Sequence, residues 1–277
     1  MSIIADCSES AYRPIPPSLV HKHSPNNVWV HHPRQRAEND LHLEYSYPMD
    51  LAGARLVDLM EVQRQAGIYF AHSHLGVPED NVFVLSSISL ERSLWRFEQH
   101  LDGQAPGGAM VVRECVDEAW APSQRALIKL SFNLLASTGA ATGSAAVRTI
   151  SRRAYERVRR LPSPPAGPSA DSVYTDHVHV GAIVVDMLDP LLSDHASDHV
   201  SAMAVLLSIE RSVLSLGALR VDALSADFRA YVEAGEDAIY RLSFGADGTF
   251  AGVVEQSAVV CTTFTGRAAA HPKWGTT

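Results

Sequence analysis

A helix-like segment that occurs twice with the same layout constrains the fold of this chain more than any other feature. The first copy is LMEVQRQA at 59–66 and the second is LLSIERSV at 206–213. Arg64 and Arg211 occupy matching positions 147 residues apart, which is about the length of one domain. In both copies a polar residue and an arginine interrupt an otherwise apolar run. The repeat predicts two related units, each built on one largely buried helix.

The hydrophobic pattern predicts the same order of elements in both halves. In the first half we expect strands at 42–47, 82–90, 93–100, 109–119, 126–136 and 147–158, and a stretch at 20–30 in which a Ser24-Pro25-Asn26-Asn27 turn separates two strand segments. One helix is expected over 51–75, and Gly76-Val77-Pro78 ends it. In the second half we expect strands at 177–187, 223–234, 238–244 and 250–264, with one helix over about 200–216. Ser197 or Asp198 is the expected cap of that helix, and Asp247-Gly248 is a hairpin signal.

The segment LPSPPAGPS at 161–169 has four prolines and no apolar period, so it is the expected linker. We therefore predict an N-terminal arm at 1–18, a first unit at 19–160, a linker at 161–172 and a second unit at 173–277. A helix that is apolar nearly all round needs a sheet wrapped around it. The expected class is α+β, with each long helix cradled in a curved antiparallel sheet.

Charge and cysteine content argue against several classes of protein. The net charge of −8 argues against general nucleic-acid binding. Cys7, Cys115 and Cys261 form neither a disulfide framework nor a metal-ligand spacing, which suits a reducing cytoplasm. No run reaches the ~18 apolar residues of a membrane span, and the N-terminus has no secretion signal. We expect a cytoplasmic protein, and its charged content of only 19% fits a surface partly covered by a partner, such as a second copy.

Several short motifs follow one another along the chain. They are Val20-His21-Lys22 with Asn27-Val28; Glu61-x-x-Arg64-Gln65-Ala66-Gly67-Ile68 with Ala71-His72; and Asp189-Pro190-Leu191, Asp194-His195 and Asp198-His199-Val200. In their order and spacing, over about residues 20–266, they resemble the A-factor biosynthesis (AfsA-like) proteins of actinomycetes. The resemblance implies a tandem (double) hotdog fold, in which two fused units pack as a pseudo-dimer, similar to the acyl-thioester dehydratases of fatty-acid synthesis.

The resemblance also implies an acyltransferase. The reaction condenses a β-ketoacyl group, carried on acyl carrier protein, with the hydroxyl of dihydroxyacetone phosphate. The ester product leads to γ-butyrolactone, butenolide or furan signalling molecules. The expected partners are therefore acyl carrier protein and dihydroxyacetone phosphate. No resident cofactor or metal is expected, because the phosphopantetheine arm of the carrier protein delivers the substrate.

Glu61 and Arg64 are the catalytic candidates in the first repeated helix. A glutamate within an apolar helix is rarely buried without a partner. By the resemblance, Glu61 faces an acyl-thioester tunnel, where desolvation would raise its pKa and suit it to accept a hydroxyl proton. Arg64 would bind the triose phosphate or orient a carbonyl oxygen. The alternative is a Glu61–Arg64 ion pair on an exposed helix face, which would contribute little.

The second repeated helix departs from this pattern. Ser208 matches Glu61, and Glu210 lies two positions later, about 200° round the helix. Either the acid is lost in the second unit, or Glu210 takes its role. Arg211 matches Arg64 and is a further candidate to bind the phosphate or the developing oxyanion. The chain then has one competent site, or one site with residues from both halves.

Histidines near these helices are candidate acid–base groups, since imidazole titrates near neutrality, and they also have a purely structural interpretation. His21 and His199, with Gln65 and Ser208, complete the predicted substrate-binding set around the two helices. A His-x-His pair on a strand places both rings on one face, but no third ligand is evident, so no metal site is expected. The two such pairs are His21 with His23 and His177 with His179.

One basic run occurs in this acidic chain: Arg148, Arg152, Arg153, Arg157, Arg159 and Arg160. Acyl carrier protein and triose phosphate are both anionic, so a basic patch would attract them, with Arg153 and Arg157 as expected contacts. The alternative is a solvated edge strand, whose charges prevent pairing with other sheets.

Two other functions fit the sequence. A hotdog thioesterase or dehydratase would act on the same thioesters, with water as nucleophile or product. Dehydratases typically use a histidine opposite the helix acid, so His21 or His177 within reach of Glu61 would favour that chemistry. A non-catalytic protein that binds acyl chains or carrier protein would explain the missing second glutamate.

Overall fold

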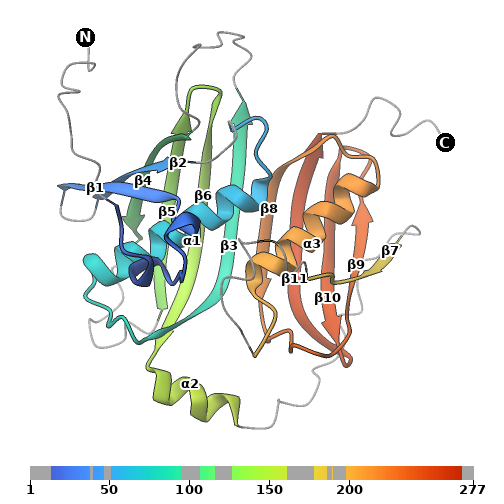
Figure 1. Cartoon of the computed structure of the whole chain (residues 1–277). Coiled ribbons are helices and arrows are strands. Elements are labelled where there is room, and N and C mark those ends of the chain that lie inside the picture. The colour runs from blue at the N-terminus through green and yellow to red at the C-terminus, as the bar shows by residue number, and fades with distance from the viewer. Residues whose placement is uncertain are drawn as a thin grey trace.

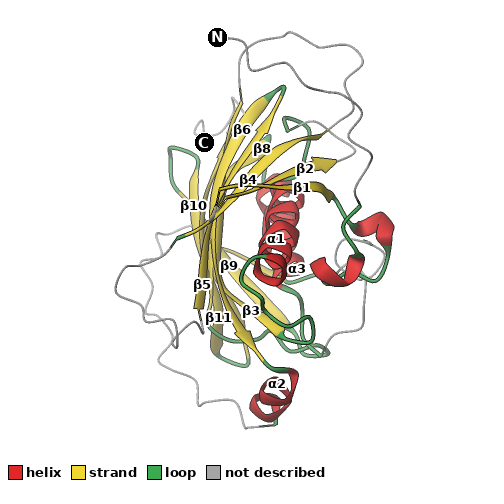
Figure 2. Ribbon diagram, turned by 90° about the vertical axis from the view of Figure 1, so that its left-hand side faces the viewer, coloured by secondary structure: helices red, strands yellow, loops and turns green. Residues whose placement is uncertain are grey.

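The computed structural model describes residues 14–37, 40–46, 51–94, 107–115, 127–160, 178–185, 189 and 198–269. Within these residues, eleven strands form one antiparallel sheet. Two long helices, α1 (Leu56–Ser73) and α3 (Ala202–Ser215), pack on one face of that sheet, as Figure 1 and Figure 2 show. A short helix, α2 (Arg152–Arg159), lies at one end of the molecule.

The remaining elements divide between the two halves of the chain. The first half supplies the 3₁₀ helices η1 (Pro17–Val20) and η2 (Pro25–Asn27) and the strands β1 (Val30–Ala37), β2 (Asp40–Ser46), β3 (Val82–Leu94), β4 (Gly107–Glu114), β5 (Leu127–Ala136) and β6 (Gly139–Ile150). The second half supplies β7 (Val178–Ala182), β8 (Arg220–Phe228), β9 (Ala238–Phe244), β10 (Thr249–Gln256) and β11 (Val259–Ala269).

The sheet is continuous across the two halves. Its strand order is β1-β2-β4-β5-β6-β3-β8-β11-β10-β9-β7. The halves join where β3 pairs with β8, from Ser87 opposite Asp227 to Glu91 opposite Ala223. The sheet curves toward the two long helices in Figure 2, as the twist of antiparallel strands favours.

Both long helices are buried nearly all round. Met60 and Phe70 of α1 and Leu206 of α3 are at most 1% exposed. The two helices contact each other as well as the sheet. The prediction of two apolar helices enclosed by an antiparallel sheet is therefore confirmed.

The beginning of α1 is held by a residue from the other half of the chain. Arg55 occupies the N-cap position, and its side chain does not bond the helix amides. The carboxylate of Glu210, on α3, instead accepts hydrogen bonds from the backbone N–H groups of Leu56 and Val57 at 2.7 and 2.9 Å. The first amides of a helix lack partners within the helix and carry partial positive charge, so a carboxylate satisfies both needs.

Arg92 of β3 supports the same junction. Its side chain is 1% exposed, and its guanidinium donates to the carbonyls of Leu51 and Ala54, just before α1, and of Val221 in β8. Burial raises the pKa of the Glu210 carboxyl, while the two amides and Arg92 act in the opposite direction. The start of α1 is thus fixed by charged groups from both halves.

Several sequence expectations about single elements are confirmed. The helices expected at 51–75 and 200–216 are α1 and α3, and the strands expected at 42–47, 126–136 and 238–244 are β2, β5 and β9. The hairpin expected at Asp247-Gly248 joins β9 to β10. There Gly248 has a φ of 81°, and the Asp247 side chain accepts from the Thr249 N–H.

The strand segments expected within 20–30 are wrong, because β1 begins only at Val30, whereas the turn expected at Ser24-Pro25-Asn26-Asn27 forms as η2. Pro17 and Pro25 stand at the first positions of these turns, where the fixed φ of proline favours a helical start. His21 follows η1 in the left-handed region, with a φ of 52°. His21 and His23 therefore do not lie on a strand, and the shared face expected for their rings does not form.

The expected strand at 147–158 is wrong in its second part. β6 ends at Ile150, and the arginine run continues as α2. The Ser151 hydroxyl caps this helix by accepting a hydrogen bond from the Ala154 N–H at 3.3 Å. Arginine, glutamate and alanine all favour helix, which explains the outcome. The interpretation of the run as an edge strand is therefore excluded for residues 152–159.

The other differences concern turns and caps. β3 is one strand where two were expected, at 82–90 and 93–100, and the strand expected at 250–264 is the β10–β11 hairpin. Its turn residues, Ser257 and Ala258, have positive φ without the glycine or asparagine that signals such a turn. The cap of α3 is Ser201, not Ser197 or Asp198, since its hydroxyl accepts from the Ala204 N–H.

The expected linker at 161–172 and residues 1–13 of the expected arm lie outside the described residues, so the domain limits stay a prediction. Among the described residues, no helix has both the length and the apolar character that crossing a bilayer requires.

We predict that Glu210→Ala lowers the free energy of unfolding by about 3–5 kcal/mol, because it leaves two buried helix amides without their acceptor and removes a negative charge near the buried Arg92. Urea unfolding followed by circular dichroism measures the change. Glu156→Gln, at an exposed position of α2, is the matched control and should change the free energy by less than about 0.5 kcal/mol. Equal effects of the two substitutions would contradict the capping role.

Candidate active site

The segment 17–29, which we call the strap, runs along one side of α1. Glu61, Gln65 and His72 line that side, because residues four and seven apart recur on one helix face. Val20 of the strap is fully buried against the helix. The polar contacts, in order along the strap, are His21 with His72, Lys22 with Glu61, and the backbone of Asn27 and Trp29 with Gln65.

Glu61 is the centre of this arrangement and is 1% exposed. Arg64 donates to both carboxylate oxygens, from Nε at 2.6 Å and from Nη2 at 2.8 Å. Lys22 Nζ lies 3.1 Å from Oε1, and Gln65 Nε2 donates to the same oxygen at 3.0 Å. A bidentate arginine and a second cation make this a strong, geometrically fixed carboxylate site.

The expected rise in the pKa of Glu61 is wrong. Burial raises the pKa of this carboxyl, as anticipated, but Arg64, Lys22 and Gln65 outweigh burial and lower the pKa to about 2. Glu61 is therefore ionised at neutral pH. The alternative of an exposed Glu61–Arg64 pair is also wrong. The two residues do pair, but Glu61 is buried and Lys22 is a second cation beside it.

Two cations meet at the Glu61 carboxylate. They are Lys22 and Arg64, whose side chains are 4% and 23% exposed. Neighbouring cations of this kind are groups that can bind an anion, such as a phosphate or a developing oxyanion. Arg64 is the more accessible of the two cations.

His21 and His72 form a pair further along α1. His72 Nδ1 lies 2.7 Å from the Val77 carbonyl, which only accepts, so this nitrogen carries the proton. In the neutral ring the Nε2 of His72 is then the acceptor, and the Nε2 of His21 donates to it at 3.1 Å. Eleven residues separate His72 from Glu61, about 16 Å along the helix. His21 thus bonds His72, and Glu61 has no histidine among its hydrogen-bond or ion-pair partners in the described residues.

The structure brings three of the predicted residues together and adds one that the sequence reasoning missed. Glu61, Arg64 and Gln65 share one network, and Lys22 completes it. Lys22 stood next to His21 in the first motif, so the motif signalled its importance. The strap was expected to be a strand, however, and the contact between Lys22 and Glu61 was not foreseen.

The candidates on α3 lie in other surroundings. The Ser208 hydroxyl accepts from the Val184 N–H at 3.1 Å. Both oxygens of Glu210 are used at the start of α1. Arg211 is 43% exposed at its side chain and pairs with Asp189 at 3.7 Å, as Arg55 does at 3.3 Å. Arg211 therefore lies near the first residues of α1, whereas Arg64 is eight residues, or about 12 Å, along that helix.

His199, Arg153 and Arg157 are also separate from the Glu61 network. His199 Nδ1 lies 2.7 Å from the adjacent Asp198 and 3.3 Å from the hydroxyl of Tyr155 in α2. Arg153 and Arg157 are exposed on α2. Of these residues, His199 belongs to the contact between α2 and the second half of the chain.

One group of metal-ligand side chains occurs in the described residues, at the β1–β2 hairpin. His31, His32 and Glu44 each place one ligand atom within 4.8 Å of the others. Adjacent strand residues normally point to opposite faces, but His32 has a φ of 49° and lies at an irregularity in the β1–β2 register. This group, not the pair His21 and His23, is where the described chain gathers such ligands.

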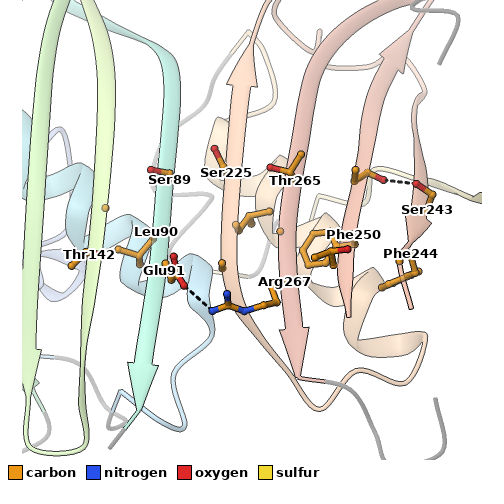
Figure 3. A pocket seen from close by; sticks show the side chains of 17 residues that line it. Ser89, Leu90, Glu91, Thr142, Ser225, Ser243, Phe244, Phe250, Thr265 and Arg267 are labelled. Carbon is orange, nitrogen blue, oxygen red and sulfur yellow. Dashed lines mark hydrogen bonds and ion pairs between the residues drawn. The ribbon is translucent and has the colours of Figure 1, made fainter. Parts of the chain in front are cut away.

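A groove of about 840 Å³ crosses the sheet on the face opposite the helices (Figure 3). Ser89, Ser225 and Thr265 line it, and Glu91 pairs with Arg267 across β8 at 2.7 Å. Leu90 and Leu224, which alternate with these residues along β3 and β8, are each 1% exposed. None of the predicted site residues lines this groove, so it is distinct from the Glu61 network.

The charge network predicts a specific dependence of stability on pH. The pKa of Glu61 is about 2 in the folded protein against an ordinary value of 4.5, so its ionised form stabilises the fold above about pH 4.5 and the contribution is lost as pH falls toward 2. This corresponds to about 3 kcal/mol. We predict that Glu61→Gln lowers the free energy of unfolding at pH 7 and that the gap to the unmodified protein narrows below pH 4.5. Denaturant unfolding at several pH values measures both. A gap that is independent of pH would contradict an ionised, partnered Glu61.

Comparison with known proteins finds a family model that matches the part of the chain containing this site. The model of the A-factor biosynthesis hotdog domain (AfsA) matches residues 5–119, which include the strap and α1. No curated protein sequence shows significant similarity to the chain. Solved structures similar to it include the 12:0-ACP thioesterase from Umbellularia californica (TM-score 0.53, 10% identity, 86% of this chain and 100% of that one). A putative oleoyl thioesterase from Lactobacillus plantarum is also similar, with a TM-score of 0.54 and 15% identity over 85% of this chain and 97% of that one. An acyl-ACP thioesterase from Bacteroides thetaiotaomicron has a TM-score of 0.51 and 12% identity over 82% of this chain and 97% of that one. At these identities the structures establish the hotdog fold alone. Residues 5–119 of this chain therefore match the A-factor biosynthesis hotdog domain, and the chain has a hotdog fold.

Proposed function

We propose that this protein is an acyltransferase that condenses a β-ketoacyl group from acyl carrier protein with dihydroxyacetone phosphate, giving the ester precursor of a γ-butyrolactone, butenolide or furan signal. The observation that carries the proposal is the group of Lys22, Glu61 and Arg64, which places two cations side by side within the residues that match the A-factor biosynthesis hotdog domain. Dihydroxyacetone phosphate is an anion, so its phosphate is a suitable ligand for these two cations.

We also propose that the two halves are two hotdog units in tandem. Each half supplies one long helix on the same face of the sheet, and these helices carry the sequence repeat around Arg64 and Arg211. The β3–β8 ladder then takes the place of the contact between two separate subunits. The thioesterases with the same fold support an acyl thioester as the class of substrate.

In the proposed reaction the triose hydroxyl attacks the thioester carbonyl. The carbon–oxygen bond of the ester forms, the carbon–sulfur bond breaks, and the hydroxyl proton passes to the departing thiol. Lys22 and Arg64 would bind the phosphate, so that the hydroxyl is held near the acyl group. Because the Glu61 carboxylate has a pKa of about 2, it is a weak base. Its geometry favours the role of a positioning residue that fixes both cations.

A dehydratase is the less favoured alternative. That chemistry was expected to show His21 or His177 within reach of Glu61. His21 instead bonds His72, and His177 lies outside the described residues. Hydrolysis of the thioester needs no second substrate, so a dependence on the triose phosphate separates it from transfer.

The test is release of free thiol from a β-ketoacyl carrier-protein thioester by the purified protein. We expect release only when dihydroxyacetone phosphate is present, together with formation of the ester, detected by mass spectrometry. Release that does not depend on the triose phosphate would indicate hydrolysis and overturn the proposal.

Substitutions then test the cations. Arg64→Lys and Lys22→Met should each raise the KM for dihydroxyacetone phosphate on the order of 10-fold to 100-fold, the effect of losing a hydrogen bond to a charged group. Lys129→Met, at an exposed position of β5, is the matched control and should leave KM unchanged. Circular dichroism of each variant establishes that it folds. An unchanged KM in both folded site variants would exclude this group as the phosphate site.

A further inference from the structure

The helix α2 has two faces with different surroundings. Its inward face carries Arg159 and Tyr155, and its outward face carries most of the basic run of the chain. Figure 1 shows α2 beyond the end of the sheet, below the two halves. A helix of eight residues is not stable alone, so its position depends on what holds the inward face.

The inward face is fixed to the second half of the chain. Arg159 donates to both oxygens of Glu233, at 2.6 and 2.5 Å, and to Asp198 at 2.8 Å. Its guanidinium also lies 4.7 Å from the centre of the Tyr231 ring. The hydroxyl of Tyr155 donates to Asp198 at 3.0 Å. Several charged contacts to one arginine hold a helix at a surface far better than a single exposed ion pair does.

The outward residues have no such partners. Arg152, Arg153, Arg157 and Arg160 are exposed, and within the described residues none of their side chains makes a hydrogen bond or an ion pair. Glu156 is the one acidic residue of α2. The result is a rigidly placed, strongly basic surface on a chain whose net charge is −8. We call these four arginines the α2 patch.

We propose that the α2 patch is the docking surface for the acyl carrier protein, and that it binds an acidic helix of that partner. This rests on the proposed function, which names the carrier protein as the acyl donor. Charge complementarity carries the assignment, because opposite charges steer the encounter and set the orientation of a complex. Arginine suits the role, since its planar group binds carboxylates in a bidentate manner and is enriched at protein interfaces.

The chemistry of the patch favours a small acidic protein over other anions. A nucleic acid would be repelled by the rest of this acidic chain. A triose phosphate carries too little charge to use four arginines spread over two helical turns. A carrier protein presents several carboxylates on one folded surface, which match several arginines at once.

The experiment measures binding of a holo-acyl carrier protein from a bacterial type II fatty-acid synthase by surface plasmon resonance, without turnover. We expect the triple variant Arg152→Glu, Arg153→Glu, Arg157→Glu to bind at least 30-fold more weakly than the unmodified chain, on the order of 2 kcal/mol. Binding of the unmodified chain should weaken as salt rises from 50 to 300 mM, and the variant should lose most of that dependence.

Arg229→Glu is the matched control, because Arg229 is exposed and its side chain has no hydrogen bond or ion pair within the described residues. It should retain the affinity of the unmodified chain. If the charge reversal prevents folding, a second triple variant is used in its place: Arg152→Gln, Arg153→Gln, Arg157→Gln, which removes the charges without reversing them. Equal affinity of this folded set and the unmodified chain would overturn the proposal. Patch-dependent binding without triose-dependent transfer would leave the docking surface in place and reject the proposed reaction.

Discussion

The structure depends on one buried carboxylate that bridges the two halves. Glu210 projects from α3 and accepts the first two amides of α1, which has no cap of its own. Those amides would otherwise be buried donors without acceptors, and the buried Arg92 would lose one of the two nearby carboxylates, the other being Asp222. This contact sets where α1 begins, and therefore where Glu61 and Arg64 lie relative to the strap. Glu210, which the sequence offered as a second catalytic acid, therefore has a structural role: it caps α1.

Periodicity predicted the elements that packing alone determines. The spacing of apolar residues predicted both long helices and most strands. A strand must turn one apolar face to the core, and each of these helices is apolar on nearly all sides. Elements that depend on single residues were not predictable in this way. Pro17 and Pro25 turned an apolar stretch into two short 3₁₀ helices, and the Ser257–Ala258 turn carries no residue that announces positive φ. The helix α2 is polar, so its pattern contained no apolar period.

The candidate site was predictable in composition but not in electrostatics. The glutamate and arginine three residues apart were recognisable, and they do form a pair. The direction of the pKa shift of Glu61 was not predictable, because it depends on how many cations the fold brings to this carboxylate. Lys22 comes from 39 positions earlier in the chain, and only the strap explains how it reaches Glu61. Local sequence thus identifies the participants, whereas tertiary contacts decide their protonation.

The β3–β8 ladder has a mechanical consequence. Backbone hydrogen bonds between these strands make the two halves one continuous sheet, so the halves are not free to hinge apart as two separately folded domains are. Movement on the helix side of the sheet is therefore left to segments that lie outside the sheet. The strap is one such segment, and its contacts with α1 include those of His21, Lys22 and Asn27. Because Lys22 belongs both to the strap and to the group around Glu61, displacement of the strap would remove one cation from that carboxylate.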